Sequence, residues 1–536
     1  MPEQSSAKPS FGLENFTTLP QLLVNSVERY GEREALRQFD KETKSWHSLS
    51  YAQLMVRVME WRRAYAAMNL ERGTRIGILM PNSIDHACAD QAALANGLVP
   101  VPLHAIDTPG ASAFILSDSR AKVLVTNKLT RWKQIKAAGG DLQDLTAVII
   151  TENEVDDETG MVRGLSEWLA AGTHVVELPE GPKEDDLAGI VYTSGTTGRP
   201  KGVMITHRNI VSNVQQINKC YDFNEEDVFL SFLPFSHTFE RTVAHYNSLA
   251  NGGAMAFARN AAQIENDLRE VRPTLMCSVP RIYEKIHQRL LHELAESSEE
   301  KRHQTAWALE TGWRRFAEAN HLPIELSPRA QLDETVWPQL DVEIASEVRE
   351  IFGGRLRATF AGGASLNYAV ARFFCALGIN ILQLYGLTET SPIVSFTRMK
   401  DNHPDCVGHP VPDCEVKLGA NDELLVRGPQ VMKGYWNRPL DTAAAFEDGW
   451  FRTGDQADLS DGGRVRIKGR IKEIIVTSTG EKIPPVDVEF AIQEDRLFEQ
   501  VLVIGDNLPY VTCLVVVNPK LWPAFCADLD LDPEDP

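Results

Sequence analysis

Short apolar runs that alternate with helical patterns are the feature that most restricts how this chain can fold. An early stretch has the pattern strand, helix, strand: RIGILM (75–80), then IDHACADQAALANG ending at Gly97, then VPVPL. A further helix and the strand AKVLVT (121–126) follow. Such alternation predicts mostly parallel sheets covered by helices. With 536 residues, the chain is long enough for about three lobes.

Four later segments share one format, in which an apolar strand precedes a polar or Gly-rich loop and then a helix. They are AGIVY before TSGTTGRPKG, VFLSFL before PFSHTFE, LRATFA before GGASLN, and INILQLY before GLTET. In open α/β sheets, ligands bind beyond the carboxyl ends of the strands. We therefore expect these four loops to face one crevice.

The pattern predicts a large domain over 1–468 and a small α+β domain over 469–536. The large domain contains stacked, mostly parallel sheets, a charged helical insertion at about 283–352 and a β-rich subdomain at about 400–468. Candidate buried residues of the insertion are Trp307, Leu309, Trp313 and Phe316. The small lobe has the strands IKEIIVT and QVLVIGD and ends in an acidic tail, so we expect it to be incomplete.

Composition excludes several classes of protein. The net charge of -20 argues against a general nucleic-acid binder but leaves room for a nucleotide ligand. Eight scattered cysteines without a CxxC motif suggest neither a zinc site nor a disulfide framework, which favours a reducing cytoplasm. The start of the chain has no signal-peptide pattern, and no run approaches the roughly 18 apolar residues of a membrane span. We expect a soluble protein, at most peripheral to a membrane.

The run TSGTTGRPKG (193–202) is the most specific motif. Its glycines let backbone N–H groups approach an anion closely, hydroxyl side chains add donors, and a lysine adds charge, as a polyphosphate requires. A flexible surface loop would have a similar composition. The spacing excludes a Walker loop, because only two residues separate Gly195 from Gly198 and Pro200 precedes the lysine.

This run resembles the signature loop of the acyl-adenylate-forming superfamily, which includes acyl-CoA synthetases, luciferases and peptide-synthetase adenylation domains. Further motifs follow in the family's order, from about Ser50 to Val517. The resemblance implies that the loop holds the β- and γ-phosphates of ATP and that Thr196 contributes to a Mg²⁺ site. The loop residues concerned are Thr193, Ser194, Gly195, Thr196, Thr197, Gly198 and Lys201.

The run YGLTE (385–389) offers an aromatic plane, a glycine, a hydroxyl and a carboxylate within five residues. It is similar to the family's YGxTE motif, which implies that Tyr385 and Gly386 contact adenine and that Thr388 binds the α-phosphate. It also implies that Glu389 holds Mg²⁺, since a carboxylate near phosphates requires a cation between them.

Further motifs and single residues resemble functional positions of the family. Gly362, Gly363 and Ala364 resemble the loop that lines the adenine and acyl sites, although a plain strand-to-helix turn would contain the same residues. The run FRTGD resembles the turn whose Asp455 accepts both ribose hydroxyls, joined there by Arg470. Lys472 matches the hinge between the two lobes, and Gly480 matches a glycine beside the tunnel for the CoA pantetheine.

The runs LPFSHTFERT (233–242) and SVPRIYEKI (278–286), with the helical insertion, resemble the long-chain fatty acyl-CoA synthetase branch. This implies that His237 lies near the acyl or phosphate site, although a lone histidine is also common in a structural role. The family's catalytic lysine near the carboxyl end has no counterpart, because no lysine follows Lys520. We expect a truncated chain for this reason.

The predicted function is ATP-dependent ligation of a fatty acid to coenzyme A, with ATP, Mg²⁺ and CoA as the cofactor and co-substrates. The acid is first adenylated with release of pyrophosphate, and the CoA thiol then displaces AMP. Two alternatives stay open. One is an adenylating enzyme with another acid or acceptor, such as a carrier-protein thiol or oxygen. The other is a nucleotide- or acyl-binding pseudoenzyme.

Overall fold

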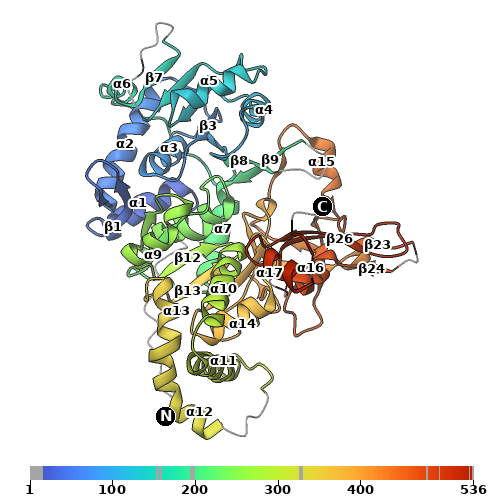
Figure 1. The fold of residues 1–536 in the computed structure, drawn as a ribbon. Helices are drawn as coiled ribbons and strands as arrows, with labels where there is room; N and C mark the ends of the chain where they lie inside the picture. The colour runs from blue at the N-terminus through green and yellow to red at the C-terminus, as the bar shows by residue number, and fades with distance from the viewer. Residues whose placement is uncertain are drawn as a thin grey trace, which may run out of the picture.

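Two sheets of mainly parallel strands organise the fold in the computed structural model (Figure 1). The structure describes residues 16–152, 155, 160–193, 199–324, 330–478, 481–493, 495, 497–529 and 531–533. The expected α/β class with a large amino-terminal region is confirmed.

The first sheet has five parallel strands in the order β4-β3-β5-β6-β7 and lies at the top of Figure 1. Its strands are β3 (Arg75–Leu79), β4 (Val99–Pro102), β5 (Val123–Thr126), β6 (Ala147–Ile150) and β7 (Val162–Gly164). Helices α2 (Tyr51–Ala67), α3 (Ile84–Ala95), α4 (Pro109–Ser119), α5 (Leu129–Ala137) and α6 (Leu165–Ala171) accompany it. The inner strands are apolar on both faces because helices cover both faces. The hydroxyl of Ser83 caps α3 by accepting a hydrogen bond from the His86 backbone.

The second sheet has nine strands in the order β16-β15-β14-β13-β12-β10-β11-β1-β2. The strands β1 (Glu34–Asp40), β10 (Val228–Ser231), β11 (Ala254–Phe257), β12 (Leu275–Ser278), β13 (Ala358–Ala361) and β14 (Ile381–Gly386) are parallel. The antiparallel strands β2 (Ser45–Ser50), β15 (Ile393–Phe396) and β16 (His409–Pro410) complete its two edges. Around it pack α1 (Leu19–Tyr30), α7 (His207–Asn218), η1 (Glu240–Tyr246), α8 (Asn247–Asn251), α9 (Ile264–Val271) and α14 (Tyr368–Ala376).

The predicted strand–loop–helix format is wrong for two of the four segments. The strand β8 (Leu187–Thr193) is followed by the antiparallel strand β9 (Lys201–Thr206), and α7 begins only after β9. The alternating run KGVMIT pairs with the β8 strand, in a register that sets Thr193 opposite Lys201. Likewise β14 leads into the short helix η4 (Thr388–Thr390) and then into the antiparallel strand β15. The sequence pattern identified the strands but not their partners.

The segment predicted as an insertion consists of helices and extends from the foot of the molecule in Figure 1. It comprises α10 (Pro280–Ala295), α11 (Glu299–Ala319), α12 (Ala330–Leu340), η3 (Asp341–Ala345) and α13 (Ser346–Ile351). Phe316 is buried, and Trp307, Leu309 and Trp313 are half-buried against the same apolar cluster. Across the ranges that the structure describes, no helix combines the length and apolar character needed to cross a membrane.

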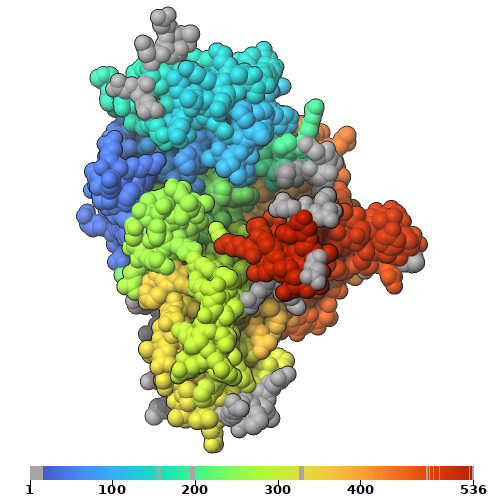
Figure 2. All heavy atoms as spheres, viewed as in Figure 1, coloured from blue at the N-terminus to red at the C-terminus, as the bar shows by residue number. Residues whose placement is uncertain are grey.

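The carboxyl-terminal part is β-rich. Strands β17 (Glu415–Leu418), β18 (Glu423–Arg427), β20 (Phe446–Glu447), β21 (Trp450–Asp458) and β22 (Arg466–Arg470) form a five-stranded antiparallel sheet, and β22 crosses the expected domain boundary at 468–469. Beyond it lie β23 (Ile475–Val476), β24 (Lys482–Ile483), α16 (Pro485–Gln493), β25 (Phe498–Ile504), β26 (Thr512–Val517) and α17 (Trp522–Asp528). Figure 2 shows this last segment, in red, on the face of the molecule turned to the viewer.

A buried ion pair joins the two parallel sheets. Asp90 on α3 contacts Arg241 on η1, and both side chains are almost fully buried. The hydroxyl of Tyr246 donates to the second oxygen of Asp90 at 3.2 Å and accepts from Arg241 Nε at 3.1 Å. Because the three groups satisfy one another away from water, the removal of one partner leaves a buried charge without compensation.

We expect Asp90→Ala to lower the free energy of unfolding by about 3–5 kcal/mol, because it leaves the Arg241 guanidinium buried and unpaired. The matched control is Asp85→Ala on the same helix, where the pair with Arg57 is partly open to solvent and is worth about 1 kcal/mol or less. Urea unfolding followed by circular dichroism measures both variants. Equal losses would contradict the role of the buried pair.

Candidate active site

The loops after β10, β13 and β14 lie at one edge of the nine-stranded sheet, because the carboxyl ends of parallel strands share an edge. Two of these loops touch. A Cβ atom at Gly362 would lie 3.3 Å from the ring of Phe239, which follows β10. Gly363 has a φ of +82°, a conformation that favours glycine, and Ala364 follows it in the same loop. The structure therefore brings the predicted GGAS loop against the segment that contains His237.

The predicted ribose residues lie together with the predicted adenine residue. The Tyr385 hydroxyl donates to Asp455 Oδ2 at 2.5 Å, and Arg470 Nε lies 2.9 Å from Asp455 Oδ1. Asp455 and Arg470 face each other across the strands β21 and β22. Burial raises the pKa of the Asp455 carboxyl, while the Arg470 charge opposes this shift. Burial and the nearby Asp455 charge raise the pKa of Tyr385, so its hydroxyl remains a donor.

The turn after β14 holds the predicted metal carboxylate. A Cβ atom at Gly386 would lie 1.8 Å from the Pro392 carbonyl oxygen, so only glycine fits this bend without displacement. Thr388 and Glu389 follow in η4, where both side chains are half-buried. Glu389 Oε1 accepts a hydrogen bond of 2.8 Å from the Tyr435 hydroxyl. Its backbone carbonyl also accepts from the Met432 N–H, which ties η4 to this segment.

Tyr435 also reaches the base of the predicted phosphate loop. It lies in β19 (Gly434–Tyr435), which pairs with β9. The Lys201 amine lies 5.3 Å from the centre of the Tyr435 ring and 2.5 Å from Asp441 Oδ1 on α15 (Pro439–Ala444). Tyr435 thus connects Lys201 with Glu389. The predicted loop residues Ser194, Gly195, Thr196, Thr197 and Gly198 lie outside the described residues.

His237 lies in the loop after β10, where solvent reaches its side chain. Its ring centre is 4.6 Å from that of His104, which follows β4 in the other parallel sheet. The hydroxyl of Ser236 is 2.6 Å from His104 Nδ1. Desolvation and the neighbouring His104 lower the pKa of His237 to about 4, so it is neutral near pH 7. The two histidines thus meet where a loop of one parallel sheet contacts a loop of the other.

The predicted hinge residue follows the ribose pair closely. Lys472 is exposed in the turn directly after β22. The preceding residue, Ile471, donates its N–H to the Gly454 carbonyl at 2.9 Å, beside Asp455. Gly480 lies outside the described residues. Within the described ranges, no group of three or more His, Cys, Asp or Glu side chains forms a metal site of its own.

Sequence reasoning missed the side chains that support this site. Tyr435 and Asp441 lie in or just after the run GPQVMKGYWN, within the β-rich subdomain predicted at about 400–468. Asp118 is a third, since it accepts from Tyr192 at 2.7 Å and from Arg438 at 2.8 Å. The aromatic pair Tyr435-Trp436 after a glycine was the available signal for the first two. Nothing in the sequence indicates the role of Asp118.

Comparison of the chain with models of protein families shows to which enzyme family it belongs. The model of the AMP-binding enzyme family matches residues 23–436, and that of the AMP-binding enzyme C-terminal domain matches residues 472–528. The chain belongs to the AMP-binding enzyme family. The suspected resemblance to this superfamily is thereby confirmed.

Curated relatives of this AMP-binding enzyme carry names of fatty acyl-CoA ligases. A long-chain-fatty-acid–CoA ligase ACSBG2 from Xenopus laevis is 28% identical over 94% of this chain and 69% of its own length. The ligase FadD15 from Mycobacterium bovis is 28% identical over 89% of this chain and 78% of its own. Fatty acyl-CoA synthetase A from Dictyostelium discoideum is 29% identical over 91% and 74%.

Solved structures share the fold. A Mycobacterium tuberculosis fatty acyl CoA synthetase matches with a TM-score of 0.67 at 22% identity, over 94% of this chain and 89% of that one. ATP-bound MatB from Rhodopseudomonas palustris matches with a TM-score of 0.70 at 24% identity, over 93% and 89%. At these identities the likeness shows the fold alone.

Glu240 is an unusual neighbour of the site. It begins η1, three residues after His237, and its side chain is fully buried. Neither carboxylate oxygen has a hydrogen-bond partner that meets normal geometry among the described residues. Burial raises the pKa of Glu240 to about 8, and the nearby Ser231 hydroxyl opposes this shift only in part. Glu240 is therefore mainly protonated near pH 7.

This raised pKa predicts how stability changes with pH. Between about pH 4.5 and 8 the unfolded chain ionises Glu240 while the folded protein keeps its proton, so the free energy of unfolding falls as pH rises through this window. Glu240→Gln has no such group to ionise. We therefore expect its free energy of unfolding to fall by about 1.4 kcal/mol less per pH unit than that of the wild type. The gain of the variant over the wild type should therefore grow from pH 5 to pH 7.5.

Denaturant unfolding at several pH values measures this difference, and Glu167→Gln, an exposed change on α6, is the control. A difference between Glu240→Gln and the wild type that stays constant with pH would contradict the raised pKa.

Proposed function

We propose that this AMP-binding enzyme is an ATP-dependent long-chain fatty acid–CoA ligase. The observation that carries the proposal is the convergence of two groups at one site. One group is Tyr385, Asp455 and Arg470, suited to an adenosine, and the other is Lys201, Tyr435 and Glu389, suited to phosphates and a cation. The names of the curated relatives support the acid and the thiol acceptor.

In the first step, a carboxylate oxygen of the fatty acid attacks the α-phosphorus of ATP and pyrophosphate leaves. This converts a poor electrophile into a mixed anhydride. The chain contributes mainly positioning and charge stabilisation, as phosphoryl-type transfers require. Asp455 accepts the ribose hydroxyls, Tyr385 stacks on the adenine, Thr388 donates to the α-phosphate, and Lys201 faces the β- and γ-phosphates.

Glu389 fits a Mg²⁺ site, because Mg²⁺ is usually held by one or two carboxylates together with substrate phosphates. An ion bound there, with Thr196 as a second contact, would neutralise phosphate charge. Tyr435 positions this carboxylate through its hydrogen bond of 2.8 Å. Burial, with the Glu389 charge as a second cause, raises the pKa of Tyr435, so its hydroxyl remains a donor.

In the second step, the CoA thiol attacks the acyl carbon and AMP leaves. The hinge at Lys472 would let the small lobe turn between the two steps, and Gly480 would border the pantetheine path. Neutral His237, with His104 beside it, offers a polar wall to the acyl group. Peripheral membrane contact and a cytoplasmic location stay predictions.

The direct test is AMP formation from ATP with palmitate, acetate or benzoate, each with and without CoA. We expect AMP only with palmitate and CoA together, because CoA completes the second step. Palmitoyl-adenylate supplied with CoA tests that step separately. AMP formation with benzoate instead of palmitate would indicate another acid, and AMP without CoA would indicate another acceptor. Adenosine nucleotide binding without any product would favour a pseudoenzyme.

Two substitutions separate the metal carboxylate from its positioning residue. We expect Glu389→Gln to lower kcat by about 100-fold, because a charge that acts on the phosphates is lost. Tyr435→Phe should lower kcat by about tenfold and raise the Mg²⁺ concentration for half-maximal rate, since one hydrogen bond to a charged group is lost. The control is the exposed Tyr510→Phe. Full activity of Glu389→Gln would overturn the assigned role.

A further inference from the structure

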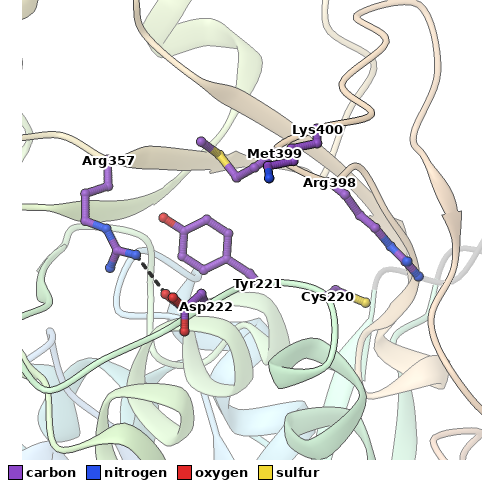
Figure 3. A pocket seen from close by; sticks show the side chains of 7 residues that line it. All are labelled: Cys220, Tyr221, Asp222, Arg357, Arg398, Met399 and Lys400. Atoms are coloured by element: carbon purple, nitrogen blue, oxygen red, sulfur yellow. Dashed lines mark hydrogen bonds between the residues drawn. The ribbon is translucent and has the colours of Figure 1, made fainter. Parts of the chain in front are cut away.

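A hollow of about 520 Å³ lies at the edge of the nine-stranded sheet opposite to the edge that carries the candidate active site. Residues 220–222, 357 and 398–400 line it (Figure 3). The first segment follows α7 and precedes β10, Arg357 immediately precedes β13, and the third segment follows the antiparallel strand β15. All three are at the amino-terminal edge of the parallel strands. Arg357 and Gly362 are at opposite ends of β13, about 16 Å apart along the strand.

Arg357 is held firmly at one wall of the hollow. One guanidinium nitrogen donates to Asp227 Oδ1 at 2.5 Å, and the other donates to the Asp222 carbonyl at 2.8 Å. Asp227 is buried and also accepts from the Thr274 hydroxyl at 2.8 Å. The Arg357 guanidinium lies 5.4 Å from the centre of the Tyr221 ring. An arginine has five N–H donors, so Arg357 has others to offer to a ligand.

Two further cations border the hollow. Arg398 and Lys400 are exposed, and neither takes part in an ion pair among the residues that the structure describes. In Figure 3, Lys400 and Met399 lie over Tyr221, and Arg398 extends toward Cys220. Asp222 is the one acidic side chain of this lining. In a protein with a net charge of -20, Arg398 and Lys400 create a local attraction for anions at the hollow, while Asp227 balances the charge of Arg357.

The remaining lining favours an anion that carries an apolar group. Tyr221 is largely buried, and burial raises the pKa of its hydroxyl to about 12, so the hydroxyl is a donor at neutral pH. Its ring and the Met399 side chain offer an apolar wall. A phosphate monoester has two negative charges and several acceptor oxygens, which match cationic and hydroxyl donors. A bare anion would leave the apolar wall uncovered.

We infer that this hollow is a binding site for a phosphate monoester with a small apolar substituent, separate from the proposed ATP site. Arg357, Lys400 and the Tyr221 hydroxyl bind the phosphate, Arg398 adds long-range attraction, and Tyr221 with Met399 contacts the substituent. The ligand is a free phosphate ester or the headgroup of a lipid, since both present the same chemistry.

The experiment is calorimetric titration of the whole protein with phenyl phosphate, inorganic phosphate and phenol. We expect phenyl phosphate to bind most tightly, inorganic phosphate more weakly and phenol not at all. Lys400→Gln should weaken phenyl phosphate at least tenfold. Lys136→Gln, the same change at an exposed position on α5, should have no effect, and neither should Lys201→Gln at the proposed ATP site. Thermal midpoints of all variants check that each remains folded.

Vesicles distinguish the two sources of the ligand. Binding to phosphatidylcholine vesicles that contain phosphatidic acid, lost in Lys400→Gln, would identify a lipid headgroup, whereas phenyl phosphate binding without vesicle binding would identify a free ester. No binding of phenyl phosphate, or equal binding by the wild type and Lys400→Gln, would overturn the inference. A loss in Lys201→Gln instead would also overturn it. None of these outcomes depends on ligase activity, so the proposed function is tested independently.

Discussion

The buried contact of Asp90, Arg241 and Tyr246 is the interaction on which the arrangement of the two parallel sheets depends. Asp90 comes from a helix of the first sheet, and the other two come from the helix that follows β10 of the second. A buried charge without its partner is costly, so this contact permits only one relative position of the two helices. His237 precedes Arg241 by one helical turn, with its carbonyl accepting the Arg241 N–H. The loop that contains His237 is therefore fixed by the same contact.

Tyr435 likewise holds distant segments together, at the candidate site. It connects Lys201, at the base of the phosphate loop, with Glu389 in the turn after β14. These residues come from three distant segments, and their meeting depends on the pairing of β19 with β9. A phenol is suited to this place because its ring accepts a cation while its hydroxyl donates to a carboxylate. The site is thus held by groups that do not themselves touch the reacting atoms.

Strands such as β3, β5, β13 and β14 could be predicted because runs of apolar, often β-branched residues between turn signals are local features. The resemblance predicts an adenine role for Tyr385 and a ribose role for Asp455, and these roles stay predictions. The β8–β9 pairing could not be predicted, since periodicity identifies a strand and not its neighbour. The burial of Glu240 without hydrogen-bond partners could not be predicted, because it results from tertiary packing. The hollow at Arg357 was missed for the same reason, since its three segments meet only when the strands align.

The short connection after Arg470 determines where the chain can be divided into two parts. Asp455 and Arg470 are anchored in the five-stranded sheet, Ile471 donates its N–H to the Gly454 carbonyl beside them, and the next turn bonds to the Arg470 carbonyl. The side-chain contacts of Tyr385, Asp455 and Arg470 all lie before residue 472, the predicted hinge. A junction after Arg470 cuts through no strand of the five-stranded sheet and leaves the contacts of Asp455 with Tyr385 and Arg470 on one side of it. Recombination between related chains is best tolerated here, so the two parts can evolve their specificities for acid and acceptor separately.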